Sequence, residues 1–192
     1  MNEIRVSCAA LAQIKIDNKY LLLMNKRSLG QNKIIYTPVG GALEYLPNGK
    51  KFLDNLNVKY ERQTPDLRLR MDKDNLELFD FWFSKGIDRE RDVFRELKEE
   101  MVDEESIIKS LSESDVEIKF IRTEKPVIDI DGLTNHFFYE IYSVEFSDDK
   151  LKEINEYIKS QGDVKKVVTL SKEQIENDDF EFEIGSNCIS IL

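Results

Sequence analysis

Three glutamates near the middle of the chain are the residues best suited to chemistry. Glu96, Glu99 and Glu100 stand at positions i, i+3 and i+4 in the run Arg95-Glu96-Leu97-Lys98-Glu99-Glu100. On a helix with 3.6 residues per turn, these positions share one face. Like charges at this spacing repel by ~0.2–0.5 kcal/mol per pair, so a bound cation would relieve an unfavourable arrangement. Carboxylate oxygens suit a hard divalent ion, and the spacing predicts a site for Mg²⁺ or Mn²⁺.

A helix over residues 88–102 would position these glutamates. Val93, Leu97 and Met101 repeat at i, i+4 and i+8, so an apolar arc beside the acidic one can dock on a core. A charged helix face is commonly just solvated, and the glutamates alone do not exclude that interpretation. Arg95, directly before the first glutamate, and a glycine-rich turn upstream favour the metal site.

The upstream turn reads Pro38-Val39-Gly40-Gly41-Ala42-Leu43-Glu44. Glycines adopt backbone conformations closed to other residues and let a ligand or metal come close. A plain turn also needs such glycines, so the position of Gly40 and Gly41 before Glu44 gives the pair its weight.

The two stretches together resemble the sequence box of the Nudix hydrolase superfamily, GX5EX7REUXEEXGU, in which U is a bulky aliphatic residue. Residues 40–44 resemble its opening Gly-Gly turn, and residues 95–100 match its REUXEE core. Val102 takes the final aliphatic position. Residues 45–85 separate the two halves, so the box is split by an insertion.

Two positions depart from the box. Ile87 stands where the superfamily has an earlier glutamate, and Met101 replaces the penultimate glycine. The missing glutamate normally braces the arginine. We therefore expect Glu44 or an acidic residue of the insertion to brace Arg95.

The resemblance implies an α+β fold, a Nudix-like α/β/α sandwich around a mixed β-sheet, in a single domain over residues 1–192. It implies metal-dependent hydrolysis of a nucleoside diphosphate linked to another moiety, with Mg²⁺ or Mn²⁺ as cofactor. The expected catalytic residues are Arg95 and the metal ligands Glu96, Glu99 and Glu100. The expected substrate-binding residues are Gly40, Gly41, Glu44, Arg68 and Arg70. The general base stays open among the three glutamates and the outlying acids Glu140, Asp129 and Asp131.

The insertion is expected to contain a β-hairpin. Residues 66–71 alternate strictly between polar and apolar types, and residues 76–83 alternate before becoming apolar. Arg68 and Arg70 would share one face of the hairpin, which either extends the sheet or roofs the active site. The insertion also resembles the SMODS-associated NUDIX-like variety of bacterial antiviral defence loci. That resemblance implies a nucleotide-derived ligand and a role in immunity.

The remaining elements follow from periodicity. Apolar alternation and apolar runs predict strands over residues 5–16, 20–24, 34–37, 115–122, 135–146 and 163–170. Helices are expected over residues 151–160 and after Ser171, which is placed to cap one. Extended segments are expected over residues 180–184 and 188–192.

Two other classes of function compete with hydrolysis. Ile87, Met101 and the insertion favour a binding module that recognises a nucleotide without turning it over. A third interpretation is a protein-interaction domain whose hairpin docks a partner. The sequence also leaves a homodimer open.

Composition limits the partners. The formal charge of −10 argues against binding of duplex nucleic acid, which depends on basic residues that neutralise phosphates. A small phosphorylated nucleotide could still be attracted by a bound cation. No stretch approaches the ~20 apolar residues of a membrane span, and the first residues lack the apolar run of a signal peptide. We expect a cytoplasmic protein with no membrane contact, in which Cys8 and Cys188 are buried thiols.

Overall fold

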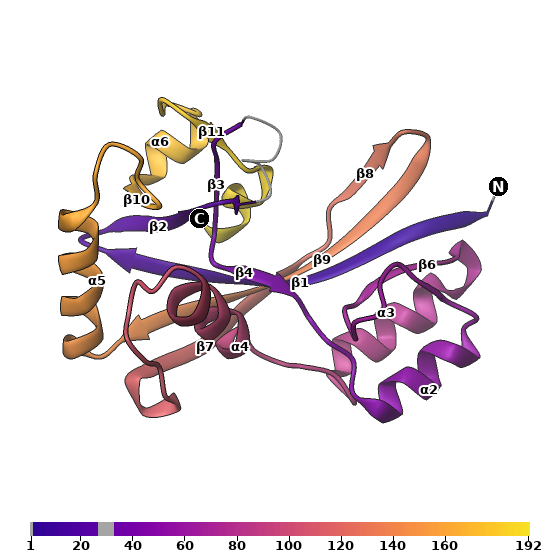
Figure 1. Cartoon of the computed structure of the whole chain (residues 1–192). Helices are drawn as coiled ribbons and strands as arrows, with labels where there is room; N and C mark the ends of the chain where they lie inside the picture. The colour runs from indigo at the N-terminus through magenta and orange to yellow at the C-terminus, as the bar shows by residue number, and fades with distance from the viewer. Residues whose placement is uncertain (1, 27–32) are drawn as a thin grey trace. The chain divides into compact units, whose positions relative to one another are not determined.

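The computed structural model describes residues 2–26 and 33–192, which form an α+β fold (Figure 1). The strands are β1 (Glu3–Ile16), β2 (Lys19–Met24), β3 (Ile35–Thr37), β4 (Gly40–Ala42), β5 (Lys59–Tyr60), β6 (Arg68–Asp72), β7 (Val116–Glu124), β8 (Val127–Ile130), β9 (Leu133–Phe146), β10 (Val167–Leu170) and β11 (Glu183–Ile184). The α-helices are α2 (Pro47–Asn55), α3 (Leu76–Lys85), α4 (Phe94–Lys98), α5 (Asp148–Ser160) and α6 (Lys172–Glu176). A π-helix, η2 (Glu99–Glu104), continues α4, and the short 3₁₀-helices of the described residues are η1 (Lys73–Asn75), η3 (Glu113–Asp115) and η4 (Ser186–Ile191).

Contacts divide the chain into two compact units. The first unit comprises residues 1–10, 41–92 and 123–140, and it therefore holds the whole insertion. The second unit comprises residues 11–40, 93–122 and 141–192.

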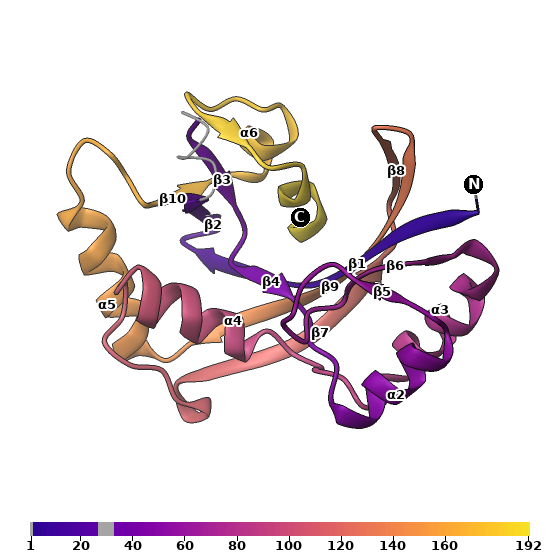
Figure 2. The same cartoon turned by 45° about the vertical axis from the view of Figure 1, so that its right-hand side comes forward.

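The first unit is a sheet with helices on one face. β1 pairs antiparallel with β6, from Glu3 opposite Asp72 to Ser7 opposite Arg68, and β6 pairs with β5 on its other side. β9 pairs with β1 and carries β8 at its far edge. The helices α2 and α3 lie together against one face of this sheet (Figures 1 and 2). That face is apolar because strand side chains alternate, and its buried members include Ile4, Val6, Leu69, Met71 and Phe138.

The second unit is built around β2. This strand pairs antiparallel with β3 and with β10, while β11 runs parallel to β3, so the sheet is mixed. Leu21, Leu22 and Tyr36 are fully buried in its core. Ser171 caps α6 by accepting a hydrogen bond from the backbone N–H of Gln174, as the sequence predicts.

The expected second strand of the inserted hairpin is wrong, because residues 76–85 form the helix α3. Phe79, Trp82 and Phe83 are buried at i, i+3 and i+4, which is helical spacing, and Gly86 ends the helix with a φ of 62°. The alternation in this stretch was misleading because Leu78 faces solvent. The insertion does contain an antiparallel pair, but its strands are β5 and β6.

The expected helix over residues 88–102 begins late, because α4 starts at Phe94. Asp88 has a φ of 55°, which a right-handed helix does not accommodate, and Arg89 forms a β-bridge with Tyr45. The final extended segment is also wrong, since Ser186–Ile191 forms η4.

Candidate functional site

The glutamate helix lies in the second unit and changes character at Glu99. Val93, Leu97 and Met101 are all fully buried, which confirms the predicted apolar arc. From Glu99 the chain follows a π-helix, and the N–H of Glu105 bonds to the carbonyl of Glu100 at 3.1 Å. A π-helix takes more residues per turn than an α-helix and is frequent at functional sites.

Each of the three predicted metal ligands has a partner within the protein. Glu96 lies 2.8 Å from Nη2 of Arg95, and Glu99 lies 3.1 Å from its Nη1. Oε2 of Glu100 accepts a hydrogen bond of 2.9 Å from the backbone N–H of Gly40. The arginine thus joins the first two glutamates, and the third ties the glycine turn to the helix.

Gly40 meets this helix in a conformation that depends on glycine. Its φ is 148°, which L side chains rarely adopt. A residue with a Cβ would strain the turn whose N–H bonds to Glu100. The structure therefore brings Gly40, Arg95 and the three glutamates together in one unit.

The carboxylate oxygens of Glu96, Glu99 and Glu100 are suitable ligands for a hard divalent cation, but these side chains do not converge on one point. Within residues 2–26 and 33–192, no group of three or more His, Cys, Asp or Glu side chains is arranged around a metal position. The carboxylates of Glu96 and Glu99 turn to Arg95 instead. The Arg95–Glu99 pair is on the surface, with side chains 29% and 49% exposed. Such pairs contribute ~0.2–1 kcal/mol, so separating Glu99 from Arg95 costs little. Glu96 is buried and pairs with the same arginine, so a cation has to compete for this carboxylate.

Arg95 forms ion pairs with Glu96 and Glu99 of its own helix. Arg95 is therefore braced without the glutamate that Ile87 replaces. The bracing role expected of Glu44 or an acidic residue of the insertion stays a prediction.

The other predicted substrate residues, Gly41, Glu44, Arg68 and Arg70, belong to the first unit. The N–H of Glu44 donates to the carboxylate of Glu90, at 3.2 Å. Arg68 is mostly buried, with its Nη1 3.4 Å from Asp66. Glu44 and Arg68 are thus engaged within this unit.

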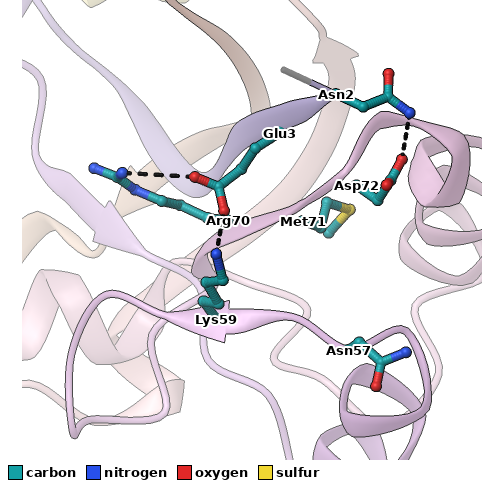
Figure 3. A pocket seen from close by; sticks show the side chains of 7 residues that line it. All are labelled: Asn2, Glu3, Asn57, Lys59, Arg70, Met71 and Asp72. Atoms are coloured by element: carbon teal, nitrogen blue, oxygen red, sulfur yellow. Dashed lines mark hydrogen bonds and ion pairs between the residues drawn. The ribbon is translucent and has the colours of Figure 1, made fainter.

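Arg70 is the more accessible of the two arginines, with its side chain 47% exposed. It lines a cavity of about 240 Å³ together with Asn2, Glu3, Asn57, Lys59, Met71 and Asp72 (Figure 3). Its guanidinium lies 3.8 Å from Glu3 and 3.6 Å from Glu61. A phosphate at Arg70 would compete with these two carboxylates.

Comparison with protein families decides the identity. Residues 3–192 match the SMODS-associated NUDIX domain, which is nearly the entire chain. The chain belongs to the SMODS-associated NUDIX domain family. The α+β Nudix-like fold expected from the split box is thereby confirmed.

Other comparisons add little. A solved structure from E. coli, described as the solution structure of the ORF135 protein, is similar to this NUDIX domain with a TM-score of 0.40 and 12% sequence identity. The similarity covers 98% of this chain and 86% of that one. No curated protein matches. Among the described residues, every helix is too short or too polar to span a bilayer.

Sequence reasoning missed a buried ion pair in the first unit of the NUDIX domain. Arg89 and Glu140 are 4% and 6% exposed, and two hydrogen bonds of 2.6 and 3.1 Å join them. The guanidinium also donates to the carbonyls of Phe83 and Glu90, and it stacks 3.9 Å from the Phe83 ring centre. Both oxygens of Glu140 are thus occupied, so this carboxylate is a structural partner and a poor candidate for the general base. No local pattern indicates the pair, because 51 positions separate its members.

A second ionic cluster, in the second unit, forms at Glu105, the residue that follows the π-helix η2. Glu105 is 7% exposed, and its two oxygens lie 2.7 Å from Lys26 Nζ and 3.0 Å from Lys166 Nζ. Burial raises the pKa of Glu105, but hydrogen bonds and charge from the two lysines outweigh it and hold the pKa below its ordinary value. The charged form is therefore favoured in the folded protein.

Glu105 should consequently make stability depend on pH. Because its folded pKa lies below the unfolded one, its contribution is complete above the unfolded pKa and is lost as pH falls through the folded pKa. We expect the difference in unfolding free energy between the wild type and Glu105→Gln to be larger at pH 7 than at pH 3. Urea unfolding at both pH values measures it. If the difference in unfolding free energy is the same at pH 7 and pH 3, ionisation of Glu105 does not contribute to stability.

Proposed function

We propose that this NUDIX domain hydrolyses the pyrophosphate linkage of a nucleoside diphosphate joined to another moiety, with a divalent cation. The observation that supports the proposal best is the acidic helix itself, on which Glu96, Glu99 and Glu100 lie together and Glu100 bonds to Gly40. A cation supplies charge neutralisation of the phosphates and a more acidic bound water. Glu96, Glu99 and Glu100 are the residues that would hold Mg²⁺ or Mn²⁺.

The chain's own groups have separate roles in this proposal. Glu100 fixes the glycine turn, where a backbone without a Cβ lets phosphate approach closely. Arg95 keeps Glu96 and Glu99 oriented when the site holds no ligand. One of the three glutamates deprotonates the water.

A second candidate function is recognition of the nucleotide without hydrolysis. The pairing of Arg95 with two of the three proposed ligands favours it, because that pairing competes with the cation. Ile87 and Met101, which replace two residues of the box, favour it as well. In this case the domain would sense a nucleotide signal. For either function we infer a role in bacterial antiviral defence, from the family's association with SMODS.

A panel of nucleoside diphosphate derivatives distinguishes the two functions. The full chain is incubated with Mg²⁺ or Mn²⁺, and release of phosphomonoester is followed beside binding measured by calorimetry. Metal-dependent release that a chelator stops supports hydrolysis. Binding of a nucleotide without release, at every metal concentration, rejects hydrolysis in favour of recognition.

The two inserted arginines should contribute to binding rather than to the metal site. We expect Arg68→Ala combined with Arg70→Ala to weaken nucleotide binding by ~1–3 kcal/mol, the scale of lost charge-assisted hydrogen bonds. Metal affinity should not change. Calorimetry with the best nucleotide of the panel measures both.

Arg62→Ala is the matched control, since Arg62 is a 46% exposed arginine of the same insertion that also pairs with Asp66. Its nucleotide affinity should stay at the wild-type value. Unchanged affinity in the double variant would mean that Arg68 and Arg70 serve only the structure of the insertion.

A further inference from the structure

The strand β8 presents an open edge. It pairs with β9, from Val127 opposite His136 to Ile130 opposite Leu133, and it has no second strand neighbour among residues 2–26 and 33–192. The end of the β8–β9 hairpin stands clear of α2 and α3 in both views (Figures 1 and 2). One side of β8 is therefore free to extend the sheet of the first unit.

The register shows which backbone groups point outward. In an antiparallel ladder, residues alternate between facing the neighbouring strand and facing away with their N–H and C=O groups. The N–H of Phe137 donates to the carbonyl of Pro126 at 2.9 Å, so Pro126 and Ile128 face β9. Val127 and Asp129 then direct their backbone groups to the open side. Proline often protects an edge because it lacks an N–H, but here that missing donor faces inward.

The side chains of β8 do not protect the edge either. Val127, Ile128 and Ile130 are 54%, 46% and 47% exposed. Natural edge strands usually carry several charges or a bulge that discourage pairing, whereas β8 carries only Asp129. Exposed aliphatic residues beside unpaired backbone groups favour an occupant that supplies both a strand and apolar contacts.

We propose that this occupant is β8 of a second copy of the chain, paired antiparallel about a two-fold axis at Val127. In this register Val127 lies opposite its own counterpart, and Lys125 lies opposite Asp129 of the partner subunit. Opposite charges in directly facing positions stabilise a strand pair, and the symmetry forms this contact twice. Outward-facing residues meet outward-facing residues, so the backbone bonds can form.

Neighbouring registers are less favourable. An axis at Asp129 places the two copies of this acid opposite each other, and like charges there are destabilising. An axis at Ile128 places Val127 opposite the carboxylate of Asp129 of the partner subunit. Of the three positions of the axis, only Val127 places apolar residues opposite apolar residues and an acid opposite a base.

The oligomeric state of the full chain tests the proposal. Light scattering coupled to size exclusion, and sedimentation across micromolar concentrations, should show a dimer for the wild type. Val127→Lys sets two identical charges opposite each other at the axis and should raise the dissociation constant at least tenfold. Val164→Lys is the control, because Val164 is 63% exposed in the second unit and should leave the dimer intact. Equal melting temperatures of wild type and variants show that folding is unaffected.

A charge exchange tests the register. Lys125→Glu should weaken the dimer, and adding Asp129→Lys should restore it, because the facing charges are again opposite. Lys125 also pairs with Asp80 at 2.5 Å within the chain, so Asp80→Asn controls for the loss of that contact. A wild type that stays monomeric overturns the proposal, as does a dimer insensitive to Val127→Lys. A dimer that the charge exchange does not restore overturns the register, and a monomer that binds extended peptides at β8 identifies a different occupant.

Discussion

Replacing Glu140 by alanine should lower the free energy of unfolding by about 3–5 kcal/mol, the usual effect of removing one partner of a buried ion pair. The substitution leaves the Arg89 guanidinium at 4% exposure without its carboxylate. The cost is mainly that of the buried charge, since Arg89 keeps its bonds to the carbonyls of Phe83 and Glu90. Urea unfolding followed by circular dichroism measures the change.

An exposed ion pair of the same unit supplies the control. Lys50 and Asp54 are 2.8 Å apart with side chains about half exposed, and Asp54 also accepts a hydrogen bond from the Tyr60 hydroxyl. Asp54→Ala should destabilise the protein much less than Glu140→Ala, because water and salt screen an exposed pair. Combining Glu140→Ala with Arg89→Met should recover part of the loss, because the uncompensated charge is then absent. If Glu140→Ala costs no more than Asp54→Ala, the pair does not hold the first unit together.

Replacing Glu99 and Glu100 together by glutamine should lower the rate of metal-dependent hydrolysis at least ~100-fold, since the charges that hold the cation are lost. The same variant tests metal binding without activity. A cation that binds only the folded state stabilises it by ~2.7 kcal/mol at a concentration 100 times its dissociation constant. Millimolar Mn²⁺ or Mg²⁺ should therefore raise the melting temperature of the wild type and leave that of the variant unchanged.

The variant should still fold. Glu99 is exposed, and a glutamine at position 100 can still accept the hydrogen bond from Gly40. Glu113→Gln, an exposed substitution on η3 of the same unit, should retain both the thermal shift and the activity. An unchanged metal-induced shift in the double variant would contradict the assignment of Glu99 and Glu100 as ligands.

Local sequence patterns predicted the residues that act within one element. The buried side of the glutamate helix was predictable, because helical spacing places Val93, Leu97 and Met101 on one arc. Ser171 predicts the cap of α6, because its hydrogen-bond partner Gln174 is only three residues away. The glycine turn before Glu44 and the run of residues 95–100 could also be identified from the sequence, because each motif consists of consecutive residues.

Patterns failed where two periods compete or where the partner is distant. Residues 76–83 satisfy both strand alternation and helical spacing, and packing of Phe79 and Phe83 on Phe138 selected the helix. The helix start moved to Phe94 because Asp88 adopts a positive φ and Arg89 is drawn into the core by Glu140. Neither effect is visible in neighbouring residues.

The sequence by itself determined the family, the α+β class and the acidic helix, since all three depend on residue types at short spacing. The tertiary structure decided which partners those residues take. It bonded Glu100 to Gly40, 60 positions away, and paired Glu140 with Arg89, which removed Glu140 from the candidate bases. A carboxylate's role depends on the donor nearest to it in space, and folding brings donors from distant positions that spacing along the chain does not encode.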